Sequence, residues 1–178
     1  MPGLVPFEEI THFFVDFEHT AWRLETQRGY ATDRVSPNWS RWKTGEKLSY
    51  DPTSPWHIKV RAKAEEGRRF ARVRLVDDPP TEGQRFLLAS GLGNVEAGED
   101  IRNLYRSEAQ RIGLPDFDFW LFDSRVLAQF VIDEDGVTVG VEVVEEPARV
   151  LAACQARDAA WHYAVPTREF QARVPSGP

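Results

Sequence analysis

The sequence predicts an α+β fold in which a mixed sheet, ending in a C-terminal antiparallel meander, packs against helices. Three strand-like runs at residues 117–122, 126–132 and 137–144 are separated only by short turns, and such strands pair antiparallel. A further strand is predicted at residues 69–76, where apolar and charged side chains are mixed. Helical runs flank both regions. We therefore expect a sheet of five or more strands, covered by helices at residues 56–66 and 147–163.

An N-terminal unit precedes the main sheet. Four apolar residues recur at helical spacing and predict a helix over residues 7–17. Alternating side chains predict a strand over residues 21–27, and a short helix is expected over residues 38–47. Proline-containing turns near residues 49–55 mark a boundary. The expected segments are a helix–strand–helix subdomain at residues 1–50, an α+β core at 51–170 and a disordered tail at 171–178.

The remaining core elements follow from local signals. Gly67 ends the helix over residues 56–66, and Pro147 opens the last helix, since proline is common in a first turn. The other expected elements are a helix at residues 81–89, a glycine-rich loop at 91–98 and a strand at 100–105.

Composition restricts the class of partner. The net charge is −6, which disfavours direct binding of duplex DNA, because phosphate contacts need concentrated Lys and Arg. Cys154 is the single cysteine, so an intramolecular disulfide is excluded and a cytoplasmic location is expected. No run approaches the roughly 20 apolar residues of a membrane span, and no membrane partner is expected.

The run at residues 17–25 gathers polar groups between two apolar elements. One interpretation places Glu18, His19, Arg23 and Glu25 around a pocket at the helix-to-strand junction. The other is structural: a buried Arg–Glu ion pair, with the histidine capping the turn.

Two arginines share one face of the strand at residues 69–76. Arg72 and Arg74 are two residues apart and repel each other unless an anion lies between them. That anion is either a ligand phosphate or carboxylate, or a protein carboxylate such as Glu99 or Asp123.

A third arginine extends this hypothesis. We predict that Arg74 and Arg102 lie on adjacent elements and share one acidic partner or bound anion, because an unpaired buried guanidinium costs several kcal/mol. The favoured protein partners are Glu25 and Asp118.

The run at residues 116–123 is apolar on both faces of a strand, which predicts a strand covered on both sides and containing Trp120. Asp118 and Asp123 bracket it. Such carboxylates act as metal ligands, general bases or turn caps, and the turn at Asp123-Ser124 favours the cap for Asp123.

Known cofactor and metal motifs are incomplete. The glycines of residues 91–98 lack the Gly-Lys-Ser/Thr of a phosphate loop. No Cys/His cluster has zinc spacing, and the acidic turn at residues 133–136 lacks the downstream glutamate of a calcium loop. We expect no cofactor and no metal.

Several motifs together resemble an uncharacterised actinobacterial family. They are FEHTAWRLE at residues 17–25, RVRLV at 72–76, AGEDIR at 97–102, DFWLFD at 118–123 and RDAAW at 157–161. Members of the family carry a domain of unknown function and are often encoded beside helix-turn-helix regulators or in specialised-metabolite gene neighbourhoods. The resemblance implies a cytoplasmic accessory or regulatory protein.

The element order from Trp56 onward also resembles a phospholipase D-type half-domain. The catalytic motif of that superfamily, His-x-Lys-x4-Asp, begins at His57 and Lys59 but has Ala64 where the Asp belongs. The resemblance implies a binding derivative of that fold.

The sequence as a whole favours a non-enzymatic, cytoplasmic binding or regulatory module for a small anionic ligand or a partner protein, such as a helix-turn-helix regulator. The alternative is a small acid–base enzyme of specialised metabolism that uses His19 with Glu18 or Asp118. The expected ligand-binding residues are Glu18, His19, Arg23, Glu25, Arg72, Arg74, Arg102, Asp118 and Trp120.

Overall fold

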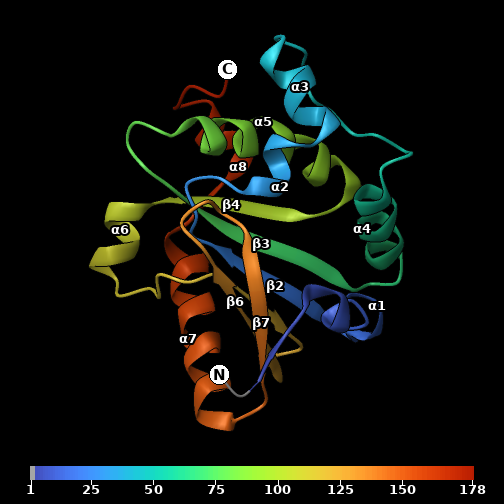
Figure 1. Cartoon of the computed structure of the whole chain (residues 1–178), viewed down its shortest axis with the longest axis vertical. Coiled ribbons are helices and arrows are strands. Elements are labelled where there is room, and N and C mark those ends of the chain that lie inside the picture. Colours follow the sequence, from blue (N-terminus) through green and yellow to red (C-terminus); the bar gives the residue numbers. More distant parts are fainter. Residues whose placement is uncertain (1–2) are drawn as a thin grey trace.

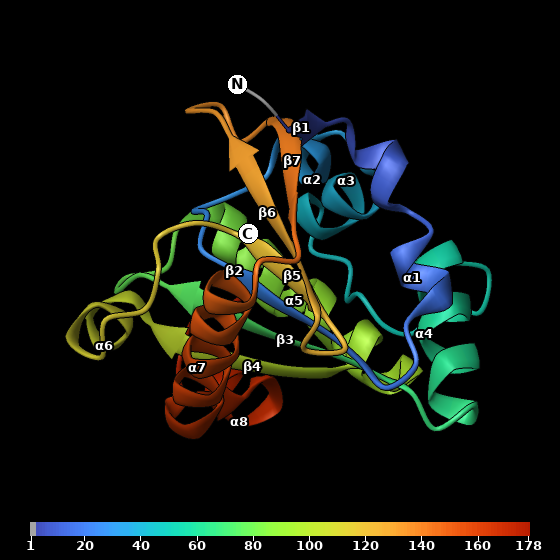
Figure 2. The same ribbon diagram turned by 90° about the horizontal axis from the view of Figure 1, so that it is seen from below.

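The structure is a computed structural model that describes residues 3–178, and these residues form one open sheet of eight strands. The strands are β1 Leu4–Val5, β2 Thr20–Glu25, β3 Arg69–Val76, β4 Asp100–Tyr105, β5 Phe119–Phe122, β6 Val126–Ile132, β7 Thr138–Val144 and β8 Val165–Pro166. Their order across the sheet is β1-β7-β6-β5-β2-β3-β4-β8, and Figures 1 and 2 together label all of these strands except β8. β2, β3 and β4 run parallel, and the other neighbouring pairs are antiparallel. The predicted α+β class, with its C-terminal meander, is confirmed.

Helices cover both faces of this sheet (Figures 1 and 2). They are the 3₁₀ helix η1 Phe7–Ile10 and the α-helices α1 Phe13–Asp16, α2 Ala31–Arg34, α3 Pro37–Lys43, α4 Pro55–Glu65, α5 Glu82–Ala97, α6 Arg106–Arg111, α7 Pro147–Tyr163 and α8 Thr167–Gln171. α7 buries one face, where Trp22 and Leu24 of β2 join Val150 and Ala153 in one apolar cluster. η1, α1, α4 and α5 contribute to the apolar cluster on the other face.

The predicted helices α4 and α7 begin at capping residues. Ser54 Oγ accepts a hydrogen bond from His57 N, and Pro55 occupies the first turn of α4. The carboxylate of Glu146 accepts from Ala148 N at 3.0 Å and Arg149 N at 2.9 Å ahead of α7. These bonds satisfy backbone donors that have no partner inside a helix.

Two predicted elements differ in the structure. The single helix expected over residues 7–17 is two short helices, η1 and α1, and neither begins at a side-chain cap. The loop expected at residues 91–98 is instead the C-terminal half of α5, which ends at Gly98 with φ +118°. Glycine is required inside this helix for close packing, because a Cβ on Gly93 would lie 2.7 Å from Ser49 O.

The expected N-terminal unit and the core share the one sheet. β2 comes from the first 50 residues, yet it lies in the middle of the sheet between β5 and β3. Residues 1 and 2 of that unit lie outside the described residues. The tail expected to be disordered contacts the body of the protein, since Trp42 Nε1 donates to Ser176 O at 3.0 Å and Arg85 Nε to Gly177 O at 2.9 Å.

Five short peripheral elements were not predicted from the sequence. They are β1, β8, α2, α6 and α8, which span between two and six residues each. Elements this short carry too few residues to establish a period. Within residues 3–178, no helix combines the length and the apolar character needed to cross a bilayer.

Candidate ligand-binding site

The polar groups of β2 and β3 lie together on the face opposite α7. The two strands are parallel, and their register places Arg23 beside Arg72 and Glu25 beside Arg74. Alternate residues of a strand point to the same face, so all four side chains project the same way. Leu24 and Val73 point to the α7 face.

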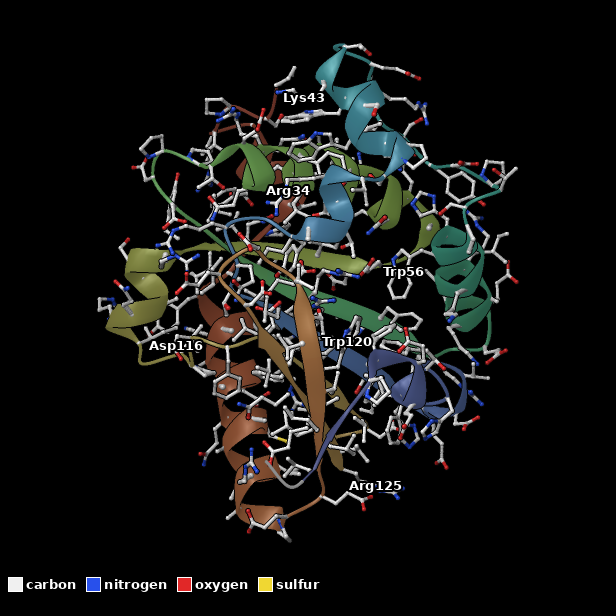
Figure 3. All side chains as sticks on the ribbon, in the orientation of Figure 1. Arg34, Lys43, Trp56, Asp116, Trp120 and Arg125 are labelled. Carbon is white, nitrogen blue, oxygen red and sulfur yellow. The ribbon has the colours of Figure 1, made fainter. Side chains whose placement is uncertain are left out.

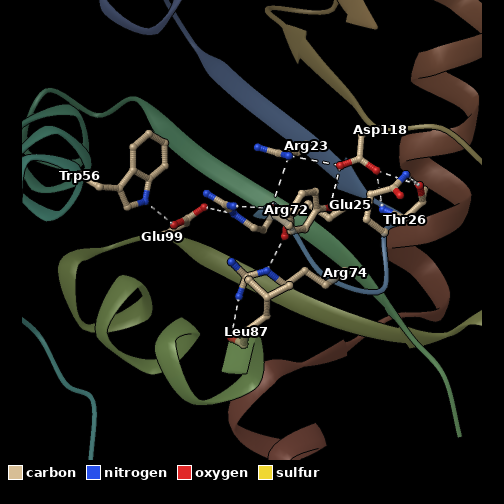
Figure 4. Close-up of polar contacts among 11 residues, drawn as sticks. Arg23, Glu25, Thr26, Trp56, Arg72, Arg74, Leu87, Glu99 and Asp118 are labelled. Carbon is tan, nitrogen blue, oxygen red and sulfur yellow. Dashed lines mark hydrogen bonds and ion pairs between the residues drawn. The ribbon is translucent and has the colours of Figure 1, made fainter. Parts of the chain in front are cut away.

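Glu25 is the centre of this cluster (Figure 4). Its Oε1 accepts a hydrogen bond from Arg72 Nη1 at 2.9 Å, and its Oε2 accepts one from Arg74 Nε. Arg23 Nε lies 3.4 Å from Oε1. A single carboxylate thus contacts three guanidinium groups, and the Glu25 side chain is only 6% exposed.

Glu99 is the second carboxylate of the cluster. It precedes β4 and accepts a hydrogen bond from Arg72 Nε at Oε1. Its Oε2 accepts from Trp56 Nε1 at 3.0 Å, which connects the network to α4 (Figure 4). The expectation that Glu99 pairs with the arginine face is confirmed at Arg72, whereas Asp123 has no part in it.

Asp118 is the third carboxylate and is completely buried. Its Oδ2 accepts from Arg23 Nη2 at 3.2 Å and from the Tyr30 hydroxyl at 2.6 Å. Its Oδ1 accepts from Thr26 N at 2.7 Å and Thr26 Oγ1 at 2.8 Å. Asp118 therefore orders the segment that follows β2 as well as pairing with Arg23.

The network contains as many acids as arginines. Burial by itself raises the pKa of Glu25, but the positive charges of Arg74, Arg72 and Arg23 outweigh it and hold that pKa well below its ordinary value. Burial lowers the pKa of Arg23, and Glu25 and Asp118 more than reverse the effect. Each of the three guanidinium groups has a carboxylate partner, Arg74 in Glu25, Arg72 in Glu25 and Glu99, and Arg23 in Asp118.

A cavity of about 520 Å³ opens over this network, and we call it the arginine cavity. Arg23, Arg72 and Arg74 line it, and each has a terminal nitrogen without a hydrogen-bond partner among the described residues; buried Arg23 Nε also lacks a hydrogen-bond partner. The three terminal nitrogens are Arg23 Nη1, Arg72 Nη2 and Arg74 Nη2. None of the three is among the fully buried atoms without a partner, and all three belong to residues that line the cavity.

Aromatic side chains form much of the wall. Trp56 and Trp120 lie between α4, α1 and the sheet (Figure 3), with ring centroids 6.2 Å apart. Phe14 meets Trp120 edge-on at 5.0 Å. The Arg72 guanidinium lies 5.4 Å from the Trp56 ring and 5.5 Å from Trp120, within cation–π range.

Asp33 and His57 also line the arginine cavity. Burial, followed by the negative charge of Glu25, raises the pKa of Asp33 to about 6, and its Oδ2 has no partner among the described residues. His57 Nδ1 lies 3.0 Å from Asp51 N and 3.2 Å from Asp51 O, and Nε2 lies 2.9 Å from Asn94 Oδ1. The His57 ring is therefore held by protein partners on both nitrogens.

Glu18 and His19 lie elsewhere. Both are exposed at the start of β2, and His19 Nε2 lies 4.0 Å from Glu18 Oε2. The carboxylate of Asp123 accepts from the backbone N–H groups of residues 18, 19 and 20 at 2.7, 2.7 and 3.0 Å, which confirms its predicted capping role. The structure does not bring His19 to the arginine cavity.

The prediction that Arg74 and Arg102 share one acidic partner or bound anion is wrong. The two arginines do lie on adjacent strands, but Arg102 is opposite Val73, which points to the α7 face. Arg102 stacks over Trp161 of α7 with its guanidinium carbon 3.9 Å from the ring centroid and donates to Trp161 O. Arg74 is paired with Glu25 instead, as one form of the prediction required.

Five of the nine predicted site residues line the arginine cavity: Arg23, Glu25, Arg72, Arg74 and Trp120. A sixth, Asp118, is buried behind the lining and accepts a hydrogen bond from Arg23. Sequence reasoning did not assign Trp56, Tyr30, Asp33 and His57 to the site, because they come from helices and loops that no local pattern places against the strands. In the described part of the chain, no group of three His, Cys, Asp or Glu side chains is arranged to hold a metal ion.

Comparison with protein families gives a match to the family described as "Domain of unknown function (DUF6879)", over residues 8–172. The chain belongs to this family. A search of curated proteins found no significant match. The DUF6879 match covers every strand of the arginine cavity, including β2, β3 and β5.

Proposed function

We propose that this DUF6879 protein is a non-enzymatic binding module for a small anionic ligand, which occupies the arginine cavity. The observation that carries the proposal is the set of three unpartnered guanidinium nitrogens in one aromatic-lined cavity of about 520 Å³. Small-molecule sites are typically concave, largely apolar and equipped with a few convergent polar groups. Guanidinium N–H groups are donors only, so the ligand must present acceptor oxygens or nitrogens.

The wider role is a proposal from the family resemblance. A cytoplasmic location and a regulatory partnership with a helix-turn-helix protein are consistent with an acidic chain that has a single cysteine. In this proposal the ligand signals through the DUF6879 protein, and the regulator rather than this chain contacts DNA. Co-purification of the two proteins, with and without ligand, tests the partnership.

The acid–base alternative loses its proposed geometry. General acid–base catalysis needs its groups within hydrogen-bond reach in a cleft. His19 is exposed at the start of β2, whereas Asp118 contacts Thr26 just beyond its end. A pair of His19 with Glu18 would have to work on the open surface, because both side chains are at least 70% exposed.

The proposal is tested by filling the cavity. Ser90 of α5 is half-buried and lines the arginine cavity without belonging to the ionic network. Ser90→Phe adds a ring to that space, and Ser107→Phe adds the same ring at an exposed position of α6. We expect small anions from a chemical library to raise the melting temperature of the wild type and of Ser107→Phe, and not that of Ser90→Phe.

Circular dichroism establishes that each variant is folded. If the stabilising compounds act equally on all three folded proteins, they bind elsewhere and the proposal fails. Exposed anion-binding sites are screened by salt, so the titrations are run at about 150 mM ionic strength.

A further inference from the structure

We infer that the ligand of the arginine cavity is an aromatic monocarboxylate, a flat ring system that carries one carboxylate. The inference rests on the proposed function and names the chemical class of the ligand. Charge balance, donor positions and wall chemistry each contribute one part of it.

The charge balance limits the charge of the ligand. Arg23, Arg72 and Arg74 are already opposed by Glu25, Glu99 and Asp118, and Asp33 adds another acid to the lining. A phosphate monoester brings two negative charges into a site without net positive charge, and the cost of removing ions from water rises steeply with charge. A carboxylate brings only one negative charge, so its removal from water costs less.

The donors suit a carboxylate. Arg72 Nη2 and Arg74 Nη2 come from the same face of β3, and Arg23 Nη1 comes from the neighbouring strand. Other nitrogens of each guanidinium are already held by Glu25, Glu99, Asp118 or Leu87 O. The free donors are therefore oriented before the ligand arrives, which reduces the entropy lost on binding.

The aromatic lining of the arginine cavity favours a ligand that contains an aromatic ring. Trp56, Trp120 and Phe14 line the same cavity as the free donors, and their edge-on and tilted contacts show how rings already pack there. An added aromatic ring makes offset or edge-to-face contacts of the same kind. An aliphatic acid of equal size gains burial but lacks those contacts.

Isothermal titration calorimetry with three probes tests the inference. They are 2-naphthoate, 2-naphthyl phosphate and decahydronaphthalene-2-carboxylate, the saturated acid with the same ring skeleton as 2-naphthoate. All are titrated at pH 8 so that the phosphate is a dianion. We expect saturable one-to-one binding of 2-naphthoate, with each of the other two probes at least about tenfold weaker. Phosphate binding as tight as that of naphthoate would overturn the inference.

A charge-conserving variant tests whether 2-naphthoate binds in the arginine cavity. Arg72→Lys keeps the positive charge but removes the forked donor set of the guanidinium group. It should lower the affinity for 2-naphthoate by at least about tenfold. Arg111→Lys, at an exposed ion pair with Glu108, should leave the affinity unchanged. Equal affinity in the two variants, each folded by circular dichroism, would contradict the inference.

Failure of this inference and failure of the proposed function have different signatures. If 2-naphthoate does not saturate the protein up to about 1 mM, the aromatic-monocarboxylate class is wrong. The proposed function still stands if another class of small anion stabilises the wild type and Ser107→Phe but not Ser90→Phe.

Discussion

Glu25 and Arg74 face each other across two parallel strands, with Arg74 Nε donating to Glu25 Oε2 inside the protein. The same carboxylate also accepts from Arg72. Glu25→Gln leaves two buried guanidinium groups without their shared anion, so we expect it to lower the free energy of unfolding by about 3–5 kcal/mol.

Urea denaturation measures this effect. The matched control is Glu142→Gln, which removes a half-buried surface carboxylate paired with Arg149 and should cost less than about 1 kcal/mol. Similar losses in the two variants would mean that the buried network contributes no more than a surface ion pair.

Asp33 gives the stability a specific pH dependence. Its folded-state pKa is raised to about 6 from an ordinary value of 3.8, so its contribution to stability is present below that ordinary value and is lost as the pH rises through about 6. Asp33→Asn cannot ionise and should gain stability relative to the wild type between pH 4 and pH 8, by at most about 3 kcal/mol. Denaturation at several pH values measures the difference, and a difference that is flat with pH would contradict the assignment.

Asp123 stabilises the turn into β2. Its carboxylate accepts from three backbone N–H groups, and despite burial these bonds hold its pKa below the ordinary value. Its contribution is therefore present above the ordinary value and is lost as the pH falls through the lowered folded-state pKa. Asp123→Ala should cost about 1–2 kcal/mol at pH 7, and the exposed Asp158→Ala much less. A neutral effect of Asp123→Ala in urea denaturation would show that water replaces the cap.

Gly93 allows α5 to pack against the segment before α4. Alanine ordinarily favours a helix over glycine by about 1 kcal/mol, but a Cβ here would lie 2.7 Å from Ser49 O and 3.1 Å from His57 Cε1. We expect Gly93→Ala to lower the melting temperature, in contrast to Ser90→Ala in the same helix. A higher melting temperature for Gly93→Ala would mean that the Ser49 segment moves away at no cost.

Much of the sheet was predictable because its signals are local. Alternation placed Arg72 and Arg74 on one face, and the turn residues Asp123 and Ser124, with φ of 52° and 55°, separated two strands. The glycine-rich residues 91–98 were wrongly predicted to form a loop. The glycine at position 93 instead lets a neighbouring backbone approach the helix closely, and such tertiary packing leaves no local signal in the sequence.

The site was predictable only within its strands. Arg102 was assigned to the wrong face because the face depends on the β3–β4 register, which pairs it with Val73. The sequence suggested that His19 and Asp118 could act together. His19 precedes β2 and Asp118 precedes β5, and these two strands pair antiparallel, with Ala21 beside Phe122 and Leu24 beside Phe119. His19 and Asp118 therefore lie at opposite ends of the β2–β5 pair. Trp56 joins the network through Glu99, a contact that only the folded chain establishes.

Native mass spectrometry of the protein purified from its own host is the decisive experiment for a ligand in the arginine cavity, because it detects whatever small molecule the cavity retains. We expect the added mass of a small molecule on the wild type and on Ser107→Phe, and no added mass on Ser90→Phe. An identical added mass on all three proteins, or bare protein in every case under conditions that preserve weak complexes, would contradict the proposal.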